Sequence, residues 1–437
     1  MGLRRMARRL TGRKLRRQSN SITASILVVL LLPTLTFYFG ASSSMALGTA
    51  LAAVIVVLIQ AAGRTPPPKN MGGTASPRRV FALLACLFGI VVLHLLAASL
   101  LSTIQWSRAL LSLLPLGLTV AASAALAQYL SAAPSPALHR ALMRCFIALC
   151  VVALLGMVGL APPSFQTYTK PVFPFTEPSH FALAFTPLLL YASVTSTGRW
   201  RMVCLLVGFA FAALLQNLTL VVSCMLAMLT SLRFGRTTVL VVVLAATAAQ
   251  LDLTYFASRL DFTAENQNLS ALVYLQGWQL IGESWKHSAG IGLGFQQLGT
   301  QGTEVDAAQL IQAVLGDNLN VLDGGFTLAK LASELGFLGV GICGAYLVVA
   351  WRSWRVLHNV AFGAVKASPV EAFAHCAIVG YLVEMFVRGG GYFTATGFLL
   401  LTGLWLTARR TAVVRKPPRK RSTRRIQHSP LGYETDH

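Results

Sequence analysis

The chain alternates between long apolar runs and short polar connections. Twelve apolar segments can be placed along it, at about 21–39, 43–62, 79–101, 108–131, 141–161, 179–197, 201–216, 217–233, 236–254, 328–351, 369–387 and 391–408. A helix needs about 20 mostly apolar residues to cross a bilayer, and most of these segments approach that length. The pattern predicts an all-α polytopic membrane protein with about 12 transmembrane helices. Only "LQNLT" at 215–219 separates the seventh segment from the eighth.

The composition agrees with a membrane location. Of the 437 residues, 55% are apolar and 11% are charged, and the mean hydropathy is +0.64. A soluble globular protein of this size is less apolar. The formal net charge of +22 could suggest a nucleic-acid partner, but the Lys and Arg residues gather in the tails and in short loops between apolar segments. This arrangement is typical of membrane topology, so we expect contact with membrane lipid and no nucleic-acid partner.

The distribution of Lys and Arg predicts which side of the membrane each loop faces, because positive charge stays on the cytoplasmic side of short loops. With the N-terminus inside, the eight cations of the first twenty residues and the basic C-terminal tail fall on the inner side. The cations that fall outside are Arg108, Lys170, Arg259, Lys286 and Arg388. We therefore expect both termini to be cytoplasmic and the first apolar segment to be a retained helix rather than a cleaved signal peptide.

Five regions follow from this topology. They are a basic cytoplasmic tail at 1–20, spans one to nine at 21–254, a large external loop at 255–327, spans ten to twelve at 328–408 and a second basic cytoplasmic tail at 409–437. The external loop holds seven of the 14 acidic residues, namely Asp261, Glu265, Glu283, Glu304, Asp306, Asp317 and Asp323. A loop of about 70 residues among short connections is more often functional than a mere connector.

The cysteines give no sign of a disulfide framework or of a metal site. All seven lie inside predicted apolar segments, and no Cys/His spacing matches a metal-binding motif. The sequence therefore predicts no metal site and no cofactor.

The motif "TEPSHF" contains Glu177, the first acidic residue in the chain. Pro178 suits the first position of a helix, which places Glu177 at the N-cap and His180 at the third helical position. A carboxylate there is stabilised by the helix dipole, and a histidine in the first turn tends toward its neutral form. The pair is either a capped start of a membrane helix or a site that binds or deprotonates a substrate hydroxyl.

Further candidate residues lie on the outer side. Lys170, Arg259 and Arg388, the last in "FVRGGGYF", are either interfacial anchors or contacts to a phosphate group, and three glycines beside Arg388 permit a close backbone approach. Tyr274 and Trp278 either stack on sugar rings or anchor the loop in lipid headgroups.

Two more features concern the loop and the tenth segment. Lys330 and Glu334 have the spacing of a helical ion pair, which is either functional or a brace for the loop. The segment "GIGLG" at 290–294 has the composition of a phosphate loop, but it lacks a preceding strand and a Lys-Ser/Thr end. We therefore do not predict a nucleotide site.

Four stretches together resemble the Wzy-type O-antigen polymerases, relatives of the O-antigen ligases. They are "FTEPSHFALAFTPLLL", "NLSALVYLQGWQ", "GIGLGFQQLG" and "LDGGFTLAKLASELGFLGVG", in a chain whose long external loop lies between spans nine and ten. The resemblance covers about 165–345 by motif and the rest by topology alone. Ligases typically carry a His-Asn pair about nine residues before the Glu of span ten, where this chain has Gly325 and Asp323. This departure favours a polymerase.

The resemblance implies a GT-C-type fold and an inverting, metal-independent glycosyl transfer on the periplasmic face of the bacterial inner membrane. The expected substrates are undecaprenyl-diphosphate-linked oligosaccharide repeat units, polymerised into O-antigen or capsule, and a chain-length regulator protein is a further partner that it allows. Glu177, His180 and Asp323 are the candidate catalytic residues. The candidate substrate contacts are Arg388, Arg259, Lys170, Tyr274, Trp278, Lys330 and Glu334.

Two alternatives stay open at this point. One is an O-antigen ligase that transfers polymer to lipid A-core. The other is a transporter, either a 12-span flippase for the same lipid-linked sugar or a major facilitator-type carrier. Such carriers usually place their long loop in the cytoplasm between two six-span halves, whereas this long loop is predicted outside, after span nine.

Overall fold

The computed structural model describes residues 2–39, 45–62, 77–159, 172–233, 235, 237, 268–316 and 321–414. These residues form thirteen helices and one isolated β-bridge, between Val172 and Phe175. Six of the described helices are long and apolar enough to cross a membrane, and three shorter ones are also apolar. The protein is therefore a helical membrane protein. The ninth predicted segment, 236–254, lies outside the described residues except for Thr237.

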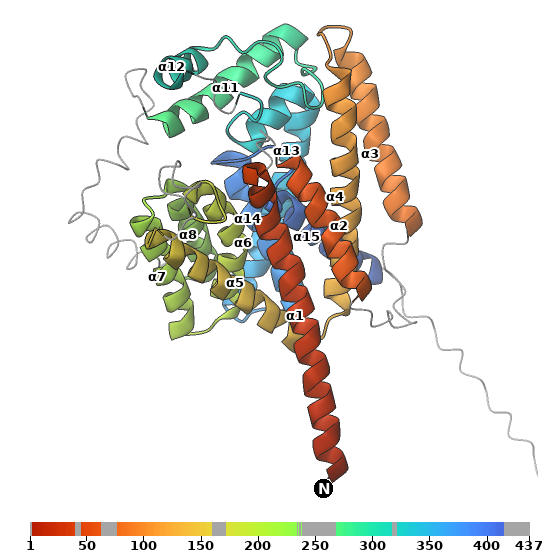
Figure 1. Ribbon diagram of the computed structural model, residues 1–437, viewed down its shortest axis with the longest axis vertical. Helices are drawn as coiled ribbons and strands as arrows, with labels where there is room; N and C mark the ends of the chain where they lie inside the picture. Colours follow the sequence, from red (N-terminus) through yellow and green to blue (C-terminus); the bar gives the residue numbers. More distant parts are fainter. Residues whose placement is uncertain are drawn as a thin grey trace, which may run out of the picture.

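The helices are arranged as a bundle with a cap at one end. In chain order they are α1 (Gly2–Phe39), α2 (Ala46–Ala62), α3 (Pro77–Ala98), α4 (Trp106–Ala132), α5 (Ser135–Met157), α6 (Pro178–Thr195), α7 (Arg199–Leu214), α8 (Leu218–Ser231), α11 (Leu269–Ser288), α12 (Asp306–Leu315), α13 (Thr327–Ala361), α14 (Pro369–Phe386) and α15 (Ala395–Val414). Helices α11 and α12 lie across one end of the bundle, and the N-terminus lies at the other (Figure 1). We call these the α11 end and the N-terminal end.

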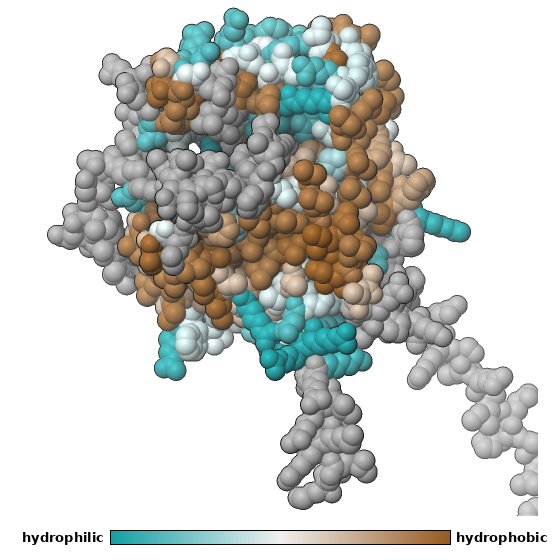
Figure 2. Space-filling model, in the orientation of Figure 1, coloured by the Kyte–Doolittle hydropathy of each residue, from teal (hydrophilic) through white to brown (hydrophobic). Residues whose placement is uncertain are grey.

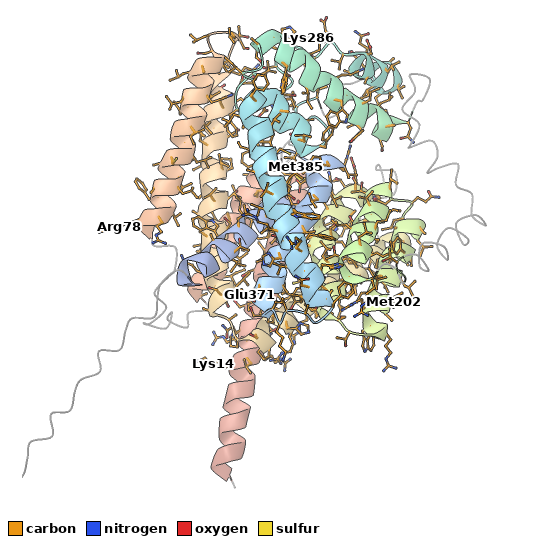
Figure 3. All side chains as sticks on the ribbon, turned by 180° about the vertical axis from the view of Figure 1, so that it is seen from behind. Lys14, Arg78, Met202, Lys286, Glu371 and Met385 are labelled. Carbon is orange, nitrogen blue, oxygen red and sulfur yellow. The ribbon has the colours of Figure 1, made fainter. Side chains whose placement is uncertain are left out.

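The surface of the bundle has the pattern that a bilayer requires. Hydrophobic side chains gather in a band around the middle of the face shown in Figure 2, and hydrophilic ones gather at the α11 end and toward the N-terminal end. Lys286 and Lys14 lie near these opposite ends in the reverse view (Figure 3). The two parts of the predicted external loop that form α11 and α12 therefore lie together, outside the apolar band.

Helix α6 lies in the interior of the bundle. Its residues 181–194 are all buried, and it packs against α5, α7, α8 and α14. A helix that is apolar around its whole circumference is stable only inside a protein or a membrane. The residues just before this buried run, 177–180, are partly exposed.

The apolar stretch that contains α7 and α8 is interrupted as the sequence predicts. Gln216 has a left-handed backbone conformation, with φ of 48°. Asn217 then caps α8, since its side-chain oxygen accepts a hydrogen bond from the N–H of Leu220 at 2.8 Å. The predicted break in "LQNLT" is confirmed.

Helix α13, which contains the tenth predicted segment, is interrupted at Gly336, where φ is 56° and ψ is −134°. The "GIGLG" segment fills the interruption. The N–H of Leu293 donates to the carbonyl of Ser333 at 3.0 Å, and the N–H of Gly294 donates to the carbonyl of Glu334 at 2.8 Å. The interruption leaves the carbonyls of Ser333 and Glu334 without hydrogen-bond donors from the helix itself. The glycines of the segment allow its backbone to come close enough to donate to them.

Candidate functional site

The start of α6 has the geometry that its sequence predicts. The helix begins at Pro178, and Glu177 is the N-cap residue. His180 is the third helical residue, and its Nδ1 lies 3.2 Å from the hydroxyl of Thr176. This contact orients the imidazole and leaves its Nε2 without a hydrogen-bond partner among the described residues.

Glu177 and Arg388, which lie in two separate sequence motifs, form an ion pair. Arg388 Nη2 donates to Glu177 Oε2 at 3.0 Å, and Ser179 Oγ donates to the same oxygen at 2.7 Å. The side chain of Glu177 turns toward Arg388 and does not cap the helix. The guanidinium group of Arg388 lowers the pKa of the Glu177 carboxyl from 4.5 to about 2. A carboxylate with so low a pKa is a weak proton acceptor at neutral pH, so Glu177 is better suited to orient a ligand than to deprotonate it.

We expect the stabilisation from this ion pair to depend on pH in the acid range. Because the folded pKa of about 2 lies below the ordinary value of 4.5, the contribution is fully present above pH 4.5 and is lost as the pH falls through 2. The measurement is the melting temperature of the wild type and of Glu177→Gln in detergent, from about pH 7 to about pH 3. The difference between the two should be constant down to about pH 5 and then shrink. A constant difference over the whole range would contradict the ion pair.

A second charged cluster lies at the start of α13. Lys330 Nζ donates to the carbonyl of Leu322 at 2.6 Å and to Asp323 Oδ1 at 3.1 Å, and it lies 3.6 Å from Glu334. Lys330 is buried, whereas the Asp323 side chain is 27% exposed. Asp323 is thus held by a buried cation and can still meet a ligand.

Glu334 has both carboxylate oxygens engaged with the loop. Oε2 accepts from the N–H of Gln296 at 2.8 Å, and Oε1 accepts from the N–H of Leu298 at 3.1 Å. The side chain is fully buried. Of the two roles considered for the Lys330 and Glu334 pair, this geometry supports bracing of the loop, and it leaves Glu334 with little capacity to bind substrate.

The glycines after Arg388 bring the two clusters together. The N–H of Gly389 donates to the carbonyl of Gly325 at 2.8 Å. A Cβ atom on Gly391, where φ is 83°, would lie 2.7 Å from Asp323 Oδ1. The close approach expected of these glycines is therefore confirmed, and it places Arg388 and Asp323 in one site.

We expect Gly389→Ala to disturb this site and Gly390→Ala to be tolerated. A Cβ on Gly389 would lie 2.9 Å from both the backbone nitrogen and the hydroxyl of Thr327, whereas a Cβ on Gly390 would come no closer than 3.5 Å to any atom. Overpacking against backbone typically costs about 1–3 kcal/mol. Thermal unfolding of the two variants measures the difference directly. Equal melting temperatures would show that the two segments are not packed in this way.

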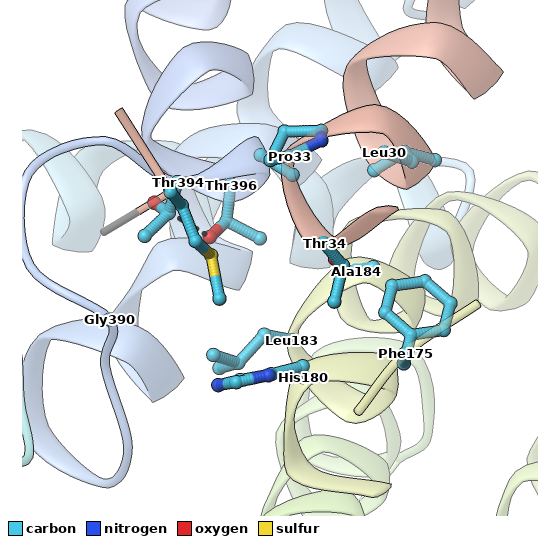
Figure 4. A pocket seen from close by; sticks show the side chains of 12 residues that line it. Leu30, Pro33, Thr34, Phe175, His180, Leu183, Ala184, Gly390, Thr394 and Thr396 are labelled. Carbon is cyan, nitrogen blue, oxygen red and sulfur yellow. Dashed lines mark hydrogen bonds between the residues drawn. The ribbon is translucent and has the colours of Figure 1, made fainter. Parts of the chain in front are cut away.

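His180 lines a pocket between α1, α6 and the start of α15 (Figure 4). The space inside it that a water molecule can reach is about 20 Å³, which is room for about one water molecule. Its polar groups come mainly from His180, Thr34, Thr394 and Thr396, and the rest of its wall is mostly apolar. Its wall therefore combines hydroxyl and imidazole groups with apolar side chains, which is the mixture typical of ligand sites.

The aromatic residues of α11 pack onto the turn that precedes α13. The rings of Tyr274 and Trp278 lie 4.9 Å and 5.2 Å from the ring of Phe326. The side chain of Trp278 is 45% exposed, so it can contact a ligand or lipid. Trp285 instead donates a hydrogen bond from Nε1 to the carbonyl of Ala332 at 2.8 Å. The structure thus places Tyr274 and Trp278 beside the site and gives Trp285 a structural contact.

Two predicted substrate contacts, Lys170 and Arg259, lie outside the described residues. The pocket threonines and Glu384, a fully buried acid near the end of α14, were not predicted from the sequence. Glu384 did carry a signal, because an acidic residue inside an apolar segment is unusual. The threonines carried none, since Thr is common in membrane helices.

No protein-family model matches the chain, and no curated protein or solved structure matches it either.

Proposed function

We propose that this protein is a polysaccharide polymerase of the kind that the Wzy-type O-antigen polymerases represent. Its substrates would be undecaprenyl-diphosphate-linked repeat units, and its reaction an inverting glycosyl transfer on the periplasmic face of the inner membrane. The observation that carries the proposal is the position of His180. It lines a mostly apolar pocket beside the Glu177–Arg388 pair, near the end of an apolar bundle that α11 and α12 cover.

In this proposal His180 accepts the proton of the attacking hydroxyl. That hydroxyl oxygen forms a bond to the anomeric carbon of the growing chain while the bond from this carbon to the diphosphate oxygen breaks. Diphosphate is a good leaving group, so orientation and a base matter more than an acid. His180 is preferred over Glu177 because its Nε2 has no described partner, whereas Glu177 is neutralised by Arg388.

The carboxylates would orient the sugar of the acceptor. Glu177 and Asp323 keep part of their side chains exposed, at 43% and 27%, and carboxylate oxygens accept hydrogen bonds from sugar hydroxyls. Arg388 has further N–H donors beyond the one on Glu177, and these would bind the diphosphate together with Lys170 and Arg259. Trp278 would stack on a sugar ring.

The finer features of the fold belong to the same proposal. They are a GT-C-type arrangement, 12 spans with both termini in the cytoplasm, and a periplasmic loop at 255–327. The position of α11 and α12 outside the apolar band supports this topology. O-antigen ligase remains the second candidate. It is disfavoured because this chain has Asp323 and Gly325 where ligases typically carry a His-Asn pair.

Deleting the gene and separating the surface polysaccharide on a gel tests the function. Loss of a polymerase should leave lipid A-core capped with a single repeat unit. Loss of a ligase would instead leave polymer on its lipid carrier, and loss of a flippase would leave neither product outside. An unchanged ladder would refute the proposal.

A further inference from the structure

Glu384 is a buried acid that has no charged partner among the described residues. It lies near the end of α14, and its side chain is fully buried. Its carboxyl forms no ion pair with a described residue, and the hydrogen-bonding groups beside it are the Thr394 hydroxyl and the backbone of Gly390. Glu334, the other fully buried acid in the described part, has two N–H donors and lies near Lys330. The burial of Glu334 is therefore explained by its partners, whereas the burial of Glu384 is not.

The groups around Glu384 cannot neutralise a carboxylate. It faces the phenol groups of Tyr346 and Tyr381, the hydroxyl of Thr394 and the backbone of Gly390. All of these groups are uncharged. A buried carboxylate without a cation is strongly unfavourable, so Glu384 is held as a neutral carboxylic acid, which is a hydrogen-bond donor.

Thr394 and Thr396 connect this acid to the pocket. Thr394 Oγ1 accepts a hydrogen bond from the N–H of Gly397 at 3.0 Å, so its own proton can be donated elsewhere. It lies 3.5 Å from the hydroxyl of Thr396. Both threonines line the pocket, across from His180 (Figure 4).

We propose that Glu384, Thr394 and Thr396 form a chain of hydrogen-bond donors that ends in the pocket. The O–H of Glu384 donates to Thr394, the O–H of Thr394 donates to Thr396, and the O–H of Thr396 donates to an oxygen of the ligand that carries or develops negative charge. The pocket then has a proton acceptor, His180, on one wall and a donor chain on the other. Glu384 is a positioning residue in this scheme because it acts through the threonines. The inference rests on the proposed function in one respect only, the identity of the ligand oxygen that accepts from Thr396. Under the proposed function that oxygen belongs to the diphosphate.

Infrared difference spectroscopy tests the state of Glu384 without reference to any activity. The spectrum of the wild type minus that of Glu384→Gln, at neutral pH in detergent, should contain the carbonyl stretch of a neutral carboxylic acid. In Thr394→Val this band should shift to higher frequency, because the carboxyl loses its hydrogen-bond partner, and in Thr394→Ser it should stay in place. Carboxylate bands in the difference spectrum, or a band that Thr394→Val does not move, would overturn the proposal.

Polymer synthesis in a membrane preparation tests whether the chain reaches the ligand. Thr394→Val should lower the rate about 10- to 100-fold, since removal of one donor to a developing negative charge costs up to about 10²–10³-fold. Thr394→Ser keeps the hydroxyl and should restore most of the rate, which a purely packing role would not predict. Equal rates for the valine and serine variants would overturn the link to the ligand. If the protein proves not to be a polymerase, the infrared result still decides the state of Glu384.

Discussion

Replacing His180 by alanine should abolish polymer formation while the protein still folds and inserts. A positioned proton acceptor contributes about 10²–10⁴-fold to a rate, and no other described group of the pocket is a comparable base. The side chain is half-buried and makes one hydrogen bond, with Thr176, so its loss leaves the packing of α6 largely intact. The measurement is incorporation of labelled repeat units into polymer by membranes that contain the variant at wild-type level.

The matched control is His375→Ala. His375 is also half-buried, and its Nδ1 contacts the hydroxyl of Ser353 at 3.0 Å, but it lies near the start of α14, at the other end of that helix from the site. This variant should keep its activity. Normal polymer from His180→Ala, with both variants at equal protein level, would remove His180 from the mechanism.

Replacing Glu334 by alanine should strongly destabilise the protein. It leaves two buried N–H groups of the loop, those of Gln296 and Leu298, without their acceptor, and it leaves Lys330 with Asp323 as its only carboxylate within 4 Å among the described residues. Removing one partner of a buried pair typically costs about 3–5 kcal/mol. We expect a large fall in melting temperature and proteolysis of the segment between α11 and α12.

Glu283→Ala is the matched control for this prediction. Glu283 pairs with Lys286 on the surface of α11, at 2.6 Å and a spacing of three residues. An exposed pair of this kind adds little to stability, because water and salt screen it. The melting temperature of Glu283→Ala should equal that of the wild type. A Glu334→Ala protein that melts like this control would show that the loop is not held by Glu334.

Much of the local structure follows from the sequence. The apolar runs predict helices because a backbone in lipid must satisfy its own hydrogen bonds, and the described residues form such helices. Pro178 and Glu177 predict the start of α6 to the residue, since Pro fixes the backbone at the first helical position. The break between α7 and α8 was readable for a similar reason, because Asn217 is a good cap.

The site itself was decided by tertiary structure. Glu177 and Arg388 are 211 residues apart in the chain, and nothing in either motif indicates that they meet. Nor does any motif indicate that Glu334 accepts hydrogen bonds from the N–H groups of Gln296 and Leu298. The interruption of α13 at Gly336, which the "GIGLG" segment fills, was not indicated by the sequence either. Such contacts depend on how helices pack, which local sequence patterns do not encode. The sequence alone determined a helical membrane protein and a set of candidate residues at one end of it. Only the tertiary structure decided which candidate residues form ion pairs and which face the pocket. The reason is that the protonation state of a buried ionisable group depends on the groups around it in space.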